Sequence, residues 1–100
     1  VNGITQSLAK ELGPRGVRVN AVCPVYVPTR GLREALASPD APPKGHDVDA
    51  YLADFTRTQT ALGRLPQASE IGAACVMLAS ASASAVTGQC INVDCGVLPS

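Results

Sequence analysis

The sequence predicts part of an α/β protein with a doubly wound parallel sheet, to which these 100 residues give the last two strands, flanking helices and an insertion. Helical segments alternate with single strand segments, and this order implies right-handed crossovers between parallel strands. The first strand stops at Pro24 and opens into a loop, as at the ligand-binding edge of such sheets. Because two parallel strands cannot form a covered sheet alone, we expect residues 1–100 to be the C-terminal fragment of a single domain.

The first predicted elements are an amphipathic helix and a buried strand. Apolar residues recur at helical spacing up to a stop at Gly13-Pro14, and this face consists of Val1, Ile4, Leu8 and Leu12. After a turn, residues 17–23 are β-branched and apolar, which is typical of a mostly buried strand. Pro24 cannot continue its hydrogen-bond ladder.

An insertion is expected at about residues 30–62. A short helix fits residues 32–37, and residues 38–45 are rich in proline and glycine. Asp47 can cap a second helix that fades near Thr60, and whose apolar face is Val48, Tyr51, Leu52 and Phe55.

The final segments return to the sheet. A turn at residues 63–66 precedes a helix that begins at Gln67 or Ser69 and has as its predicted inward residues Ile71, Cys75, Leu78 and Ala79. Small residues end this helix, and residues 90–93 form the last strand. Asp94 is interpreted as a turn carboxylate that accepts backbone N–H groups.

Composition excludes several classes of function. The formal net charge is zero, so nothing attracts a nucleic-acid backbone. The longest apolar run, residues 73–79, is far short of the roughly 20 residues of a transmembrane helix. The four cysteines lack C-x-x-C spacing, which favours a reducing, cytoplasmic location over disulfides or a metal site.

Two groups of residues carry a resemblance to a known family. Pro24, Val27 and Thr29 match the pattern P-G-x-[VI]-x-T, and further matches in the same order are Gly63-Arg64, Glu70-Ile71, Leu78-Ala79-Ser80, Thr87-Gly88 and Asn92-Val93-Asp94. The chain thus resembles the C-terminal part of the classical short-chain dehydrogenase/reductases, whose fold is a Rossmann-like sheet. Val25 and Cys95 depart from the pattern, because each replaces a glycine of the family.

The resemblance implies an NAD(P)-dependent oxidoreductase that interconverts an alcohol and a carbonyl by hydride transfer. It implies a cofactor, NAD or NADP, held by Pro24, Val25, Val27 and Thr29, with backbone contacts from Val27 and a hydroxyl contact from Thr29. The insertion would act as a substrate lid, with substrate contacts from Tyr26, Leu32, Tyr51 and Phe55. The family's catalytic serine, tyrosine and lysine would precede Val1, so no catalytic residue is assigned and this chain alone should be inactive.

Other interpretations stay open. Tyr26 could instead pack under the insertion, and Arg30 and Arg33 are expected to be solvated. His46 is interpreted as a loop histidine without a role. The chain could be a non-catalytic structural or oligomerisation module, since the family commonly forms homodimers and homotetramers, or part of a related enoyl reductase. The small-molecule substrate and the choice between NAD and NADP are not readable from these residues.

Overall fold

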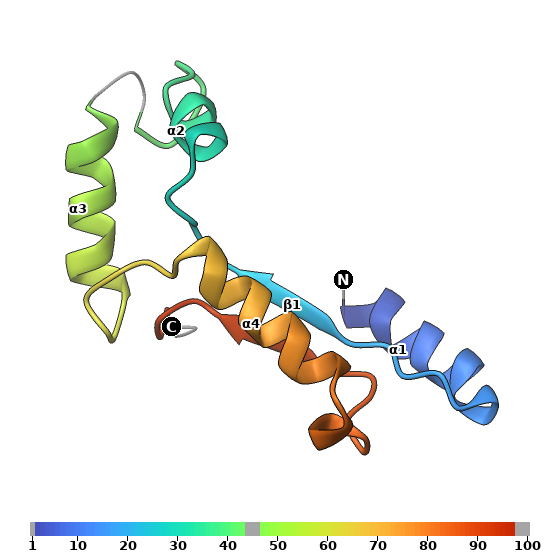
Figure 1. Ribbon diagram of the computed structural model, residues 1–100. Helices are drawn as coiled ribbons and strands as arrows, with labels where there is room; N and C mark the ends of the chain where they lie inside the picture. The colour runs from blue at the N-terminus through green and yellow to red at the C-terminus, as the bar shows by residue number, and fades with distance from the viewer. Residues whose placement is uncertain (1, 44–46, 98–100) are drawn as a thin grey trace. The chain divides into compact units, whose positions relative to one another are not determined.

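The computed structural model describes residues 2–43 and 47–97. Within these ranges the sheet consists of two strands, β1 (Ala21–Pro24) and β2 (Cys90–Val93) (Figure 1). The α-helices in chain order are α1 (Asn2–Leu12), α2 (Arg30–Leu36), α3 (Val48–Gln59) and α4 (Ala68–Ala79). Short 3₁₀ turns follow α1 at Gly13–Arg15 and α4 at Ala81–Ala83. The predicted α/β class and element order are confirmed.

The two strands run parallel. The N–H of Gly88 donates to the carbonyl of Val19 at 2.7 Å, and the N–H of Ala21 donates to the carbonyl of Gln89 at 2.8 Å. The partner numbers therefore increase together along the two segments, which is the pattern of parallel pairing. The sequence-based expectation of a parallel sheet is confirmed.

The first strand is shorter than predicted, because side chains replace part of its ladder. The N–H of Val19 donates to the hydroxyl of Thr87, and the N–H of Gln89 donates to the side-chain oxygen of Asn20, both at 3.1 Å. These bonds occupy the positions at which a regular strand would pair backbone with backbone. Regular β1 thus begins at Ala21 and includes Pro24 as its last residue. The second strand has its predicted bounds.

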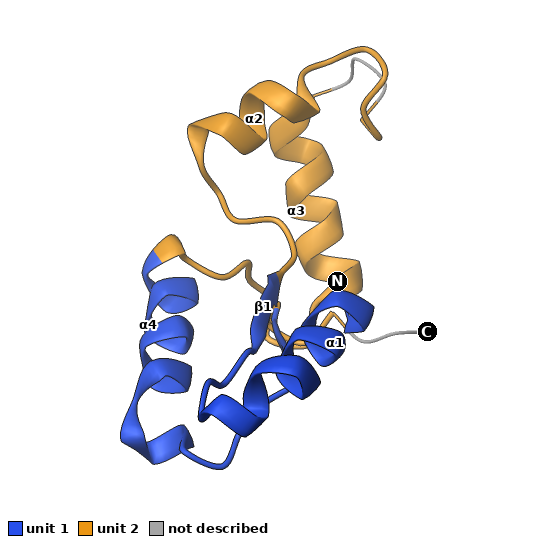
Figure 2. Ribbon diagram, turned by 90° about the vertical axis from the view of Figure 1, so that its right-hand side faces the viewer, with its two compact units in different colours: residues 1–23, 69–93 blue, residues 24–68, 94–100 orange. Residues whose placement is uncertain are grey.

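The chain divides into two compact units (Figure 2). One comprises Val1–Cys23 with Ser69–Val93, and the other comprises Pro24–Ala68 with Asp94–Ser100. In the first unit, α1 and α4 lie on opposite sides of β1 in Figure 2. The second unit contains the whole insertion, with α2 and α3. Each unit is compact by itself.

Helix α1 forms as predicted, but the face that it buries is different. Thr5 and Ala9 are buried, whereas Ile4 is 69% exposed and Leu8 is 40% exposed. Ala9 meets the turn before β2 closely, because a Cβ added at Gly88 would lie 3.5 Å from the Ala9 Cβ. The small residues of the helix therefore pack inside this chain, whereas Ile4 and Leu8 of the predicted apolar face are exposed and Leu12 is half-buried. Val1 lies outside the described residues.

Helix α4 also differs from the expectation in its buried face. Leu78 is buried and Ile71 is half-buried, whereas Cys75 and Ala79 are exposed, although both border the hollow beside the strand segment together with Leu78. Val76 is 71% exposed. An alanine-rich helix with apolar residues on every face gives no clear local signal for its inner side. Of the helices in the described ranges, none is long and apolar enough to cross a bilayer.

The insertion follows its local signals closely. The Asp47 carboxylate accepts the N–H of Asp49 at 2.9 Å and caps α3, as predicted. The expected apolar residues of this helix are all half-buried, namely Val48, Tyr51, Leu52 and Phe55. Helix α2 begins two residues before its predicted start, since Thr29 supplies a cap there. His46 and part of the proline-rich loop lie outside the described residues.

A turn after β2 joins the insertion. The Asp94 carboxylate accepts the N–H groups of Gly96 at 3.0 Å and Val97 at 3.3 Å, so its predicted turn role is confirmed. The carbonyls of Cys95 and Gly96 accept the N–H groups of Leu62 and Ala61, at 3.0 and 3.1 Å. The turn at Asp94–Val97 is thereby tied to the residues after α3 inside one compact unit.

Candidate functional site

The candidate site begins where β1 ends, in the segment from Pro24 to Thr29. Two prolines, Pro24 and Pro28, fix the backbone φ angle at either end of this segment. The residues between them, Val25, Tyr26 and Val27, are half-buried. A constrained backbone at the carboxyl end of a parallel strand is the position at which α/β folds present ligand contacts.

Two residues at the centre of this segment, Val25 and Val27, have backbone groups that can meet a ligand. Within the described parts of the chain, the N–H and C=O groups of Val25 and Val27 make no hydrogen bond. Half-buried backbone groups require a partner from protein, water or ligand. A planar carboxamide offers one donor and one acceptor, so the nicotinamide amide of NAD(P) fits this segment chemically. When bound, that cofactor would supply the hydride-transfer chemistry.

The replacement of the family glycine by Val25 needs no unusual backbone angle. Among the described residues that are not glycine, Cys95 is the only one with a positive φ, so Val25 lies in a region open to any L-residue. The conformational objection to valine at this position is therefore removed. The replacement of glycine by valine therefore matters here only through the volume of the added side chain.

Thr29 connects the segment to the insertion. Its backbone is extended, and its hydroxyl oxygen accepts the N–H of Leu32 at 3.2 Å, which caps α2. A threonine hydroxyl still has its own hydrogen to donate while it accepts a capping bond. The exposed Thr29 can therefore cap the helix and contact a ligand at the same time. Leu32 is half-buried in the first turn of α2.

Three aromatic rings gather beside the segment. The ring of Tyr26 lies 4.9 Å from that of Phe55 and 6.1 Å from that of Tyr51, both with edge-to-face geometry. The hydroxyls of Tyr26 and Tyr51 are 3.0 Å apart and share a hydrogen bond. The structure thus places three of the four predicted substrate residues together. It also shows that Tyr26 packs against α3 of the insertion, which was one of its two open interpretations.

The hydrogen bond between the two hydroxyls makes Tyr51 less acidic. The hydrogen bond with Tyr26, with smaller contributions from burial and from the charge that Tyr26 would carry when ionised, raises the pKa of Tyr51 from 10.0 to about 12. The proton of Tyr51 is held because ionisation would remove it from the bond between the two oxygens. At neutral pH the Tyr51 phenol is therefore uncharged and can both donate and accept a hydrogen bond.

The two basic residues near the site pair with acids. Arg30 contacts Glu34 one turn further along α2, and Arg33 forms an ion pair with Asp49 at the start of α3. The side chain of Arg30 is 92% exposed, and that of Arg33 is 53% exposed. Both agree with the expectation of solvated side chains. The Arg33 pair also links the two helices of the insertion.

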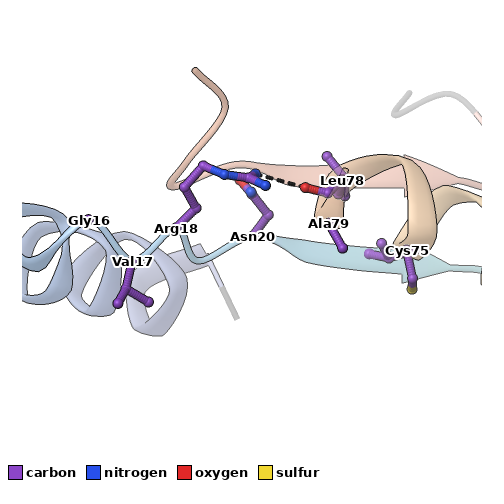
Figure 3. A pocket seen from close by; sticks show the side chains of 8 residues that line it. Gly16, Val17, Arg18, Asn20, Cys75, Leu78 and Ala79 are labelled. Carbon is purple, nitrogen blue, oxygen red and sulfur yellow. Dashed lines mark hydrogen bonds between the residues drawn. The ribbon is translucent and has the colours of Figure 1, made fainter. Parts of the chain in front are cut away.

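Arg18 was missed in the sequence analysis as an organising residue. Its guanidinium donates to the carbonyl of Leu78 at 2.7 Å (Figure 3). It also donates to the carbonyls of Val86 at 3.1 Å and Ser80 at 3.4 Å. Asn20 adds a bond to the Val86 carbonyl at 2.9 Å. The signal for both lay in the R-V-N alternation, which points two polar side chains to one side of an otherwise apolar strand.

An open hollow lies between this strand segment and α4. Its volume is about 570 Å³, and it is bordered by residues 16–22 and by Cys75, Leu78 and Ala79 of α4 (Figure 3). The hollow is rich in apolar surface and carries few convergent polar groups other than Arg18, whose hydrogen bonds are already used. It is the uncovered side of a sheet strand rather than a site prepared for a polar ligand.

Catalytic and metal-binding groups are not assembled in the described residues. No Y-x-x-x-K occurs in the sequence. In the ranges that the structure covers, no cluster of three or more histidine, cysteine, aspartate or glutamate side chains is placed to hold a metal. The candidate site, as the described residues show it, consists of the backbone segment from Pro24 to Thr29 and the aromatic wall of Tyr26, Tyr51 and Phe55.

Known proteins have sequences similar to that of this chain. A family model described as "Enoyl-(Acyl carrier protein) reductase" matches residues 1–98. An uncharacterized oxidoreductase of Methylorubrum extorquens is 40% identical over 97 residues, which cover 97% of this chain and 35% of that protein. The L-tagatose-forming galactitol 2-dehydrogenase of Cereibacter sphaeroides is 38% identical over 96 residues, covering 96% of this chain and 34% of the enzyme.

A solved structure shows the same fold. The crystal structure of a short chain dehydrogenase family protein from Francisella tularensis superposes with a TM-score of 0.81 at 30% identity, covering 96% of this chain and 39% of that one. The fold defines the class as α/β proteins with a Rossmann-type sheet. Within that class, the chain belongs to the short-chain dehydrogenase/reductase family. It spans about a third of the length of the curated relatives that it matches.

Proposed function

We propose that this chain is the C-terminal part of an NAD(P)-dependent oxidoreductase that interconverts an alcohol and a carbonyl by hydride transfer. In this proposal Pro24, Val25, Val27 and Thr29 face the nicotinamide end of the cofactor. Tyr26, Leu32, Tyr51 and Phe55 face the substrate, and the insertion acts as its lid. The single observation that carries the proposal is the free backbone of Val25 and Val27 at the end of a parallel strand.

The role of each group follows from its chemistry. The carboxamide of a nicotinamide would bond the backbone of Val27, which decides which face of the ring meets the substrate. The aromatic wall would exclude bulk water from the hydride transfer. The acid and base of the reaction would come from residues that are not part of this chain, so the isolated chain should have no activity.

A related reaction is the second candidate. The matching family model is described by an enoyl reductase, which reduces a carbon–carbon double bond instead of a carbonyl. The galactitol dehydrogenase relative favours alcohol–carbonyl chemistry. Both reactions use the same nicotinamide contacts, so substrate comparison separates them.

A structural role is the third candidate. The exposed Ile4 and Leu8 on α1, with the exposed Val76 on α4, are apolar surfaces that other protein could cover. We propose homodimer or homotetramer formation for the intact protein, and a cytoplasmic location in keeping with its four free cysteines. In the purely structural version of this candidate, the intact protein would associate but would not bind NAD(P)H.

The test compares the isolated 100 residues with the intact protein that contains them. We expect the intact protein to bind NADH or NADPH, measured by cofactor fluorescence, and to reduce L-tagatose or acetoacetyl-CoA faster than crotonyl-CoA. The isolated chain should show neither property. Micromolar binding by the isolated chain, or reduction of crotonyl-CoA alone by the intact protein, would contradict the proposal.

A further inference from the structure

We propose that the phenols of Tyr26 and Tyr51 form a hydrogen-bonded pair that holds α3 against the segment after β1 and thereby sets substrate affinity. The two tyrosines would be positioning residues for the reaction, and this inference rests on the function proposed above. It goes beyond that function because it assigns substrate affinity to one hydrogen bond between the cofactor segment and the lid.

The first support is where the aromatic residues of the chain gather. The whole sequence has two tyrosines, one phenylalanine and no tryptophan. All three rings meet in this one cluster, although Tyr26 and Tyr51 are 25 positions apart. Aromatic pairs in edge-to-face contact stabilise by about 0.5–1.5 kcal/mol beyond their burial, so the cluster is a firm contact between two otherwise separate segments.

The second support is the position of each partner. Tyr26 lies between Val25 and Val27, whose backbone faces the cofactor in our proposal. Tyr51 lies in the first turns of α3, close to the Asp47 cap. The bond of 3.0 Å between their hydroxyls therefore links the lid directly to the cofactor segment. The Arg33–Asp49 ion pair ties α2 to the same end of α3, so the lid has a second, weaker attachment nearby.

The third support is the hydrogen-bond inventory of the pair. Two phenols have two hydrogens, and one of them is used in the shared bond. The other hydrogen belongs to the phenol that accepts, and it remains available to an acceptor oxygen on a bound molecule. The pair therefore presents ring edges together with a single donor, which suits the carbonyl oxygen of a substrate.

The expected consequence separates substrate binding from cofactor binding. Removal of one hydroxyl leaves both rings in place, so α3 loosens without a cavity. The prolines on either side still fix the cofactor segment, so its contacts persist. Loss of one hydrogen bond of this kind corresponds to a KM about 3- to 10-fold higher. The value of kcat and the NADH dissociation constant should each stay within about twofold of wild type.

The experiment uses the intact protein with Tyr26→Phe, Tyr51→Phe and the double variant. The matched control is Thr58→Val, because that hydroxyl is exposed on the same helix and bonds the Asp54 carbonyl of its own turn at 2.8 Å. Steady-state kinetics uses the more rapidly reduced of L-tagatose and acetoacetyl-CoA, and thermal unfolding verifies folding. NMR of the ring-labelled Tyr51 follows its titration, and its pKa should fall from about 12 toward 10.0 in Tyr26→Phe.

The outcomes test the tyrosine-pair inference separately from the proposed NAD(P)-dependent function. The inference is supported if both single variants raise KM and the double variant resembles the more severe single one, because all three lose the same bond. It is overturned if KM is unchanged, if the two effects simply multiply, or if Thr58→Val behaves alike. Failure of wild type to bind NAD(P)H overturns the proposed function itself, which is a different result from normal binding with unaffected variants.

Discussion

At the scale of single residues, the turn after β2 carries the clearest local constraint. Cys95 has a φ of 57° and Gly96 a φ of 84°, both in the left-handed region. A non-glycine residue pays about 1–2 kcal/mol for that conformation. The backbone at Cys95 therefore keeps the angle that suits the glycine of the family pattern, even though the residue has changed. The Asp94 carboxylate stabilises the turn by accepting the N–H groups that follow.

Unlike the position of Cys95, the position of Gly96 leaves no room for a side chain. A Cβ at Gly96 would lie 2.5 Å from the Ala61 Cβ and 3.3 Å from the Ala61 nitrogen. We expect Gly96→Ala to lower the free energy of unfolding by about 2–3 kcal/mol, from the clash and the positive φ together. Urea unfolding of the intact protein measures it.

A second substitution separates the two causes. Ala61→Gly removes the nearest atom, so the pair Gly96→Ala with Ala61→Gly should recover part of the loss, while the φ contribution persists. If Gly96→Ala is as stable as wild type, the close approach of the turn to Ala61 is incorrect.

At the scale of elements, Arg18 fastens the end of α4 to the strands. Carbonyl groups at a helix C-terminus lack partners within the helix, and a cation with several donors satisfies them well. Arg18 reaches Leu78 and Ser80 there, and it also reaches Val86 ahead of β2. One side chain thus holds the helix and the approach to the second strand in register.

Substitution of Arg18 should measure how much these hydrogen bonds contribute to stability. We expect Arg18→Met to lower the free energy of unfolding of the intact protein by about 2–3 kcal/mol, because charge-assisted bonds are lost and carbonyls stay unpaired. Arg18→Lys should fall between Met and wild type, since it restores the charge without the planar fork. Arg57→Met is the control, because its pair with Asp54 is exposed and should contribute less than about 0.5 kcal/mol. Equal effects of Arg18→Met and Arg57→Met would contradict the assignment.

The elements also show which structural features were predictable. The Asp47 cap, the spacing of apolar residues in α3 and the β-branched run before Pro24 are local signals, and each marked its element correctly. The burial of α1 and α4 was not predictable in the same way, because how far a helix face is buried depends on what covers it. Ile4 and Cys75 are as apolar as core residues, yet they are exposed in this chain. The true start of β1 depended on the side chains of Asn20 and Thr87, which no strand pattern includes.

Some features of the candidate site were likewise predictable from the sequence, and others were not. The segment from Pro24 to Thr29 and the aromatic face of α3 were recognisable from sequence, because both are contiguous or periodic. The contact between Tyr26 and Tyr51 was not, since nothing local relates residues 25 positions apart. The double role of Thr29 as a cap and an exposed hydroxyl likewise emerged only from the structure.

At the scale of the whole molecule, the described chain leaves apolar surface uncovered on α1, on α4 and beside β1. Two parallel strands with an open hollow of about 570 Å³ at one side are not a finished sheet. The chain spans about a third of its relatives, which accounts for the uncovered surface if the remainder supplies neighbouring strands and helices. In that arrangement, and under the proposed function, this chain would contribute the nicotinamide side of the pocket and the lid.

The most direct measurement is a crystal structure of the intact protein with NAD(P)⁺ bound. The account expects the backbone of Val27 within hydrogen-bonding distance of the nicotinamide carboxamide, with Thr29 near the same end of the cofactor. It also expects a further parallel strand along the free edge of β1. A nicotinamide bound away from residues 24–29, or an antiparallel strand beside β1, would contradict it.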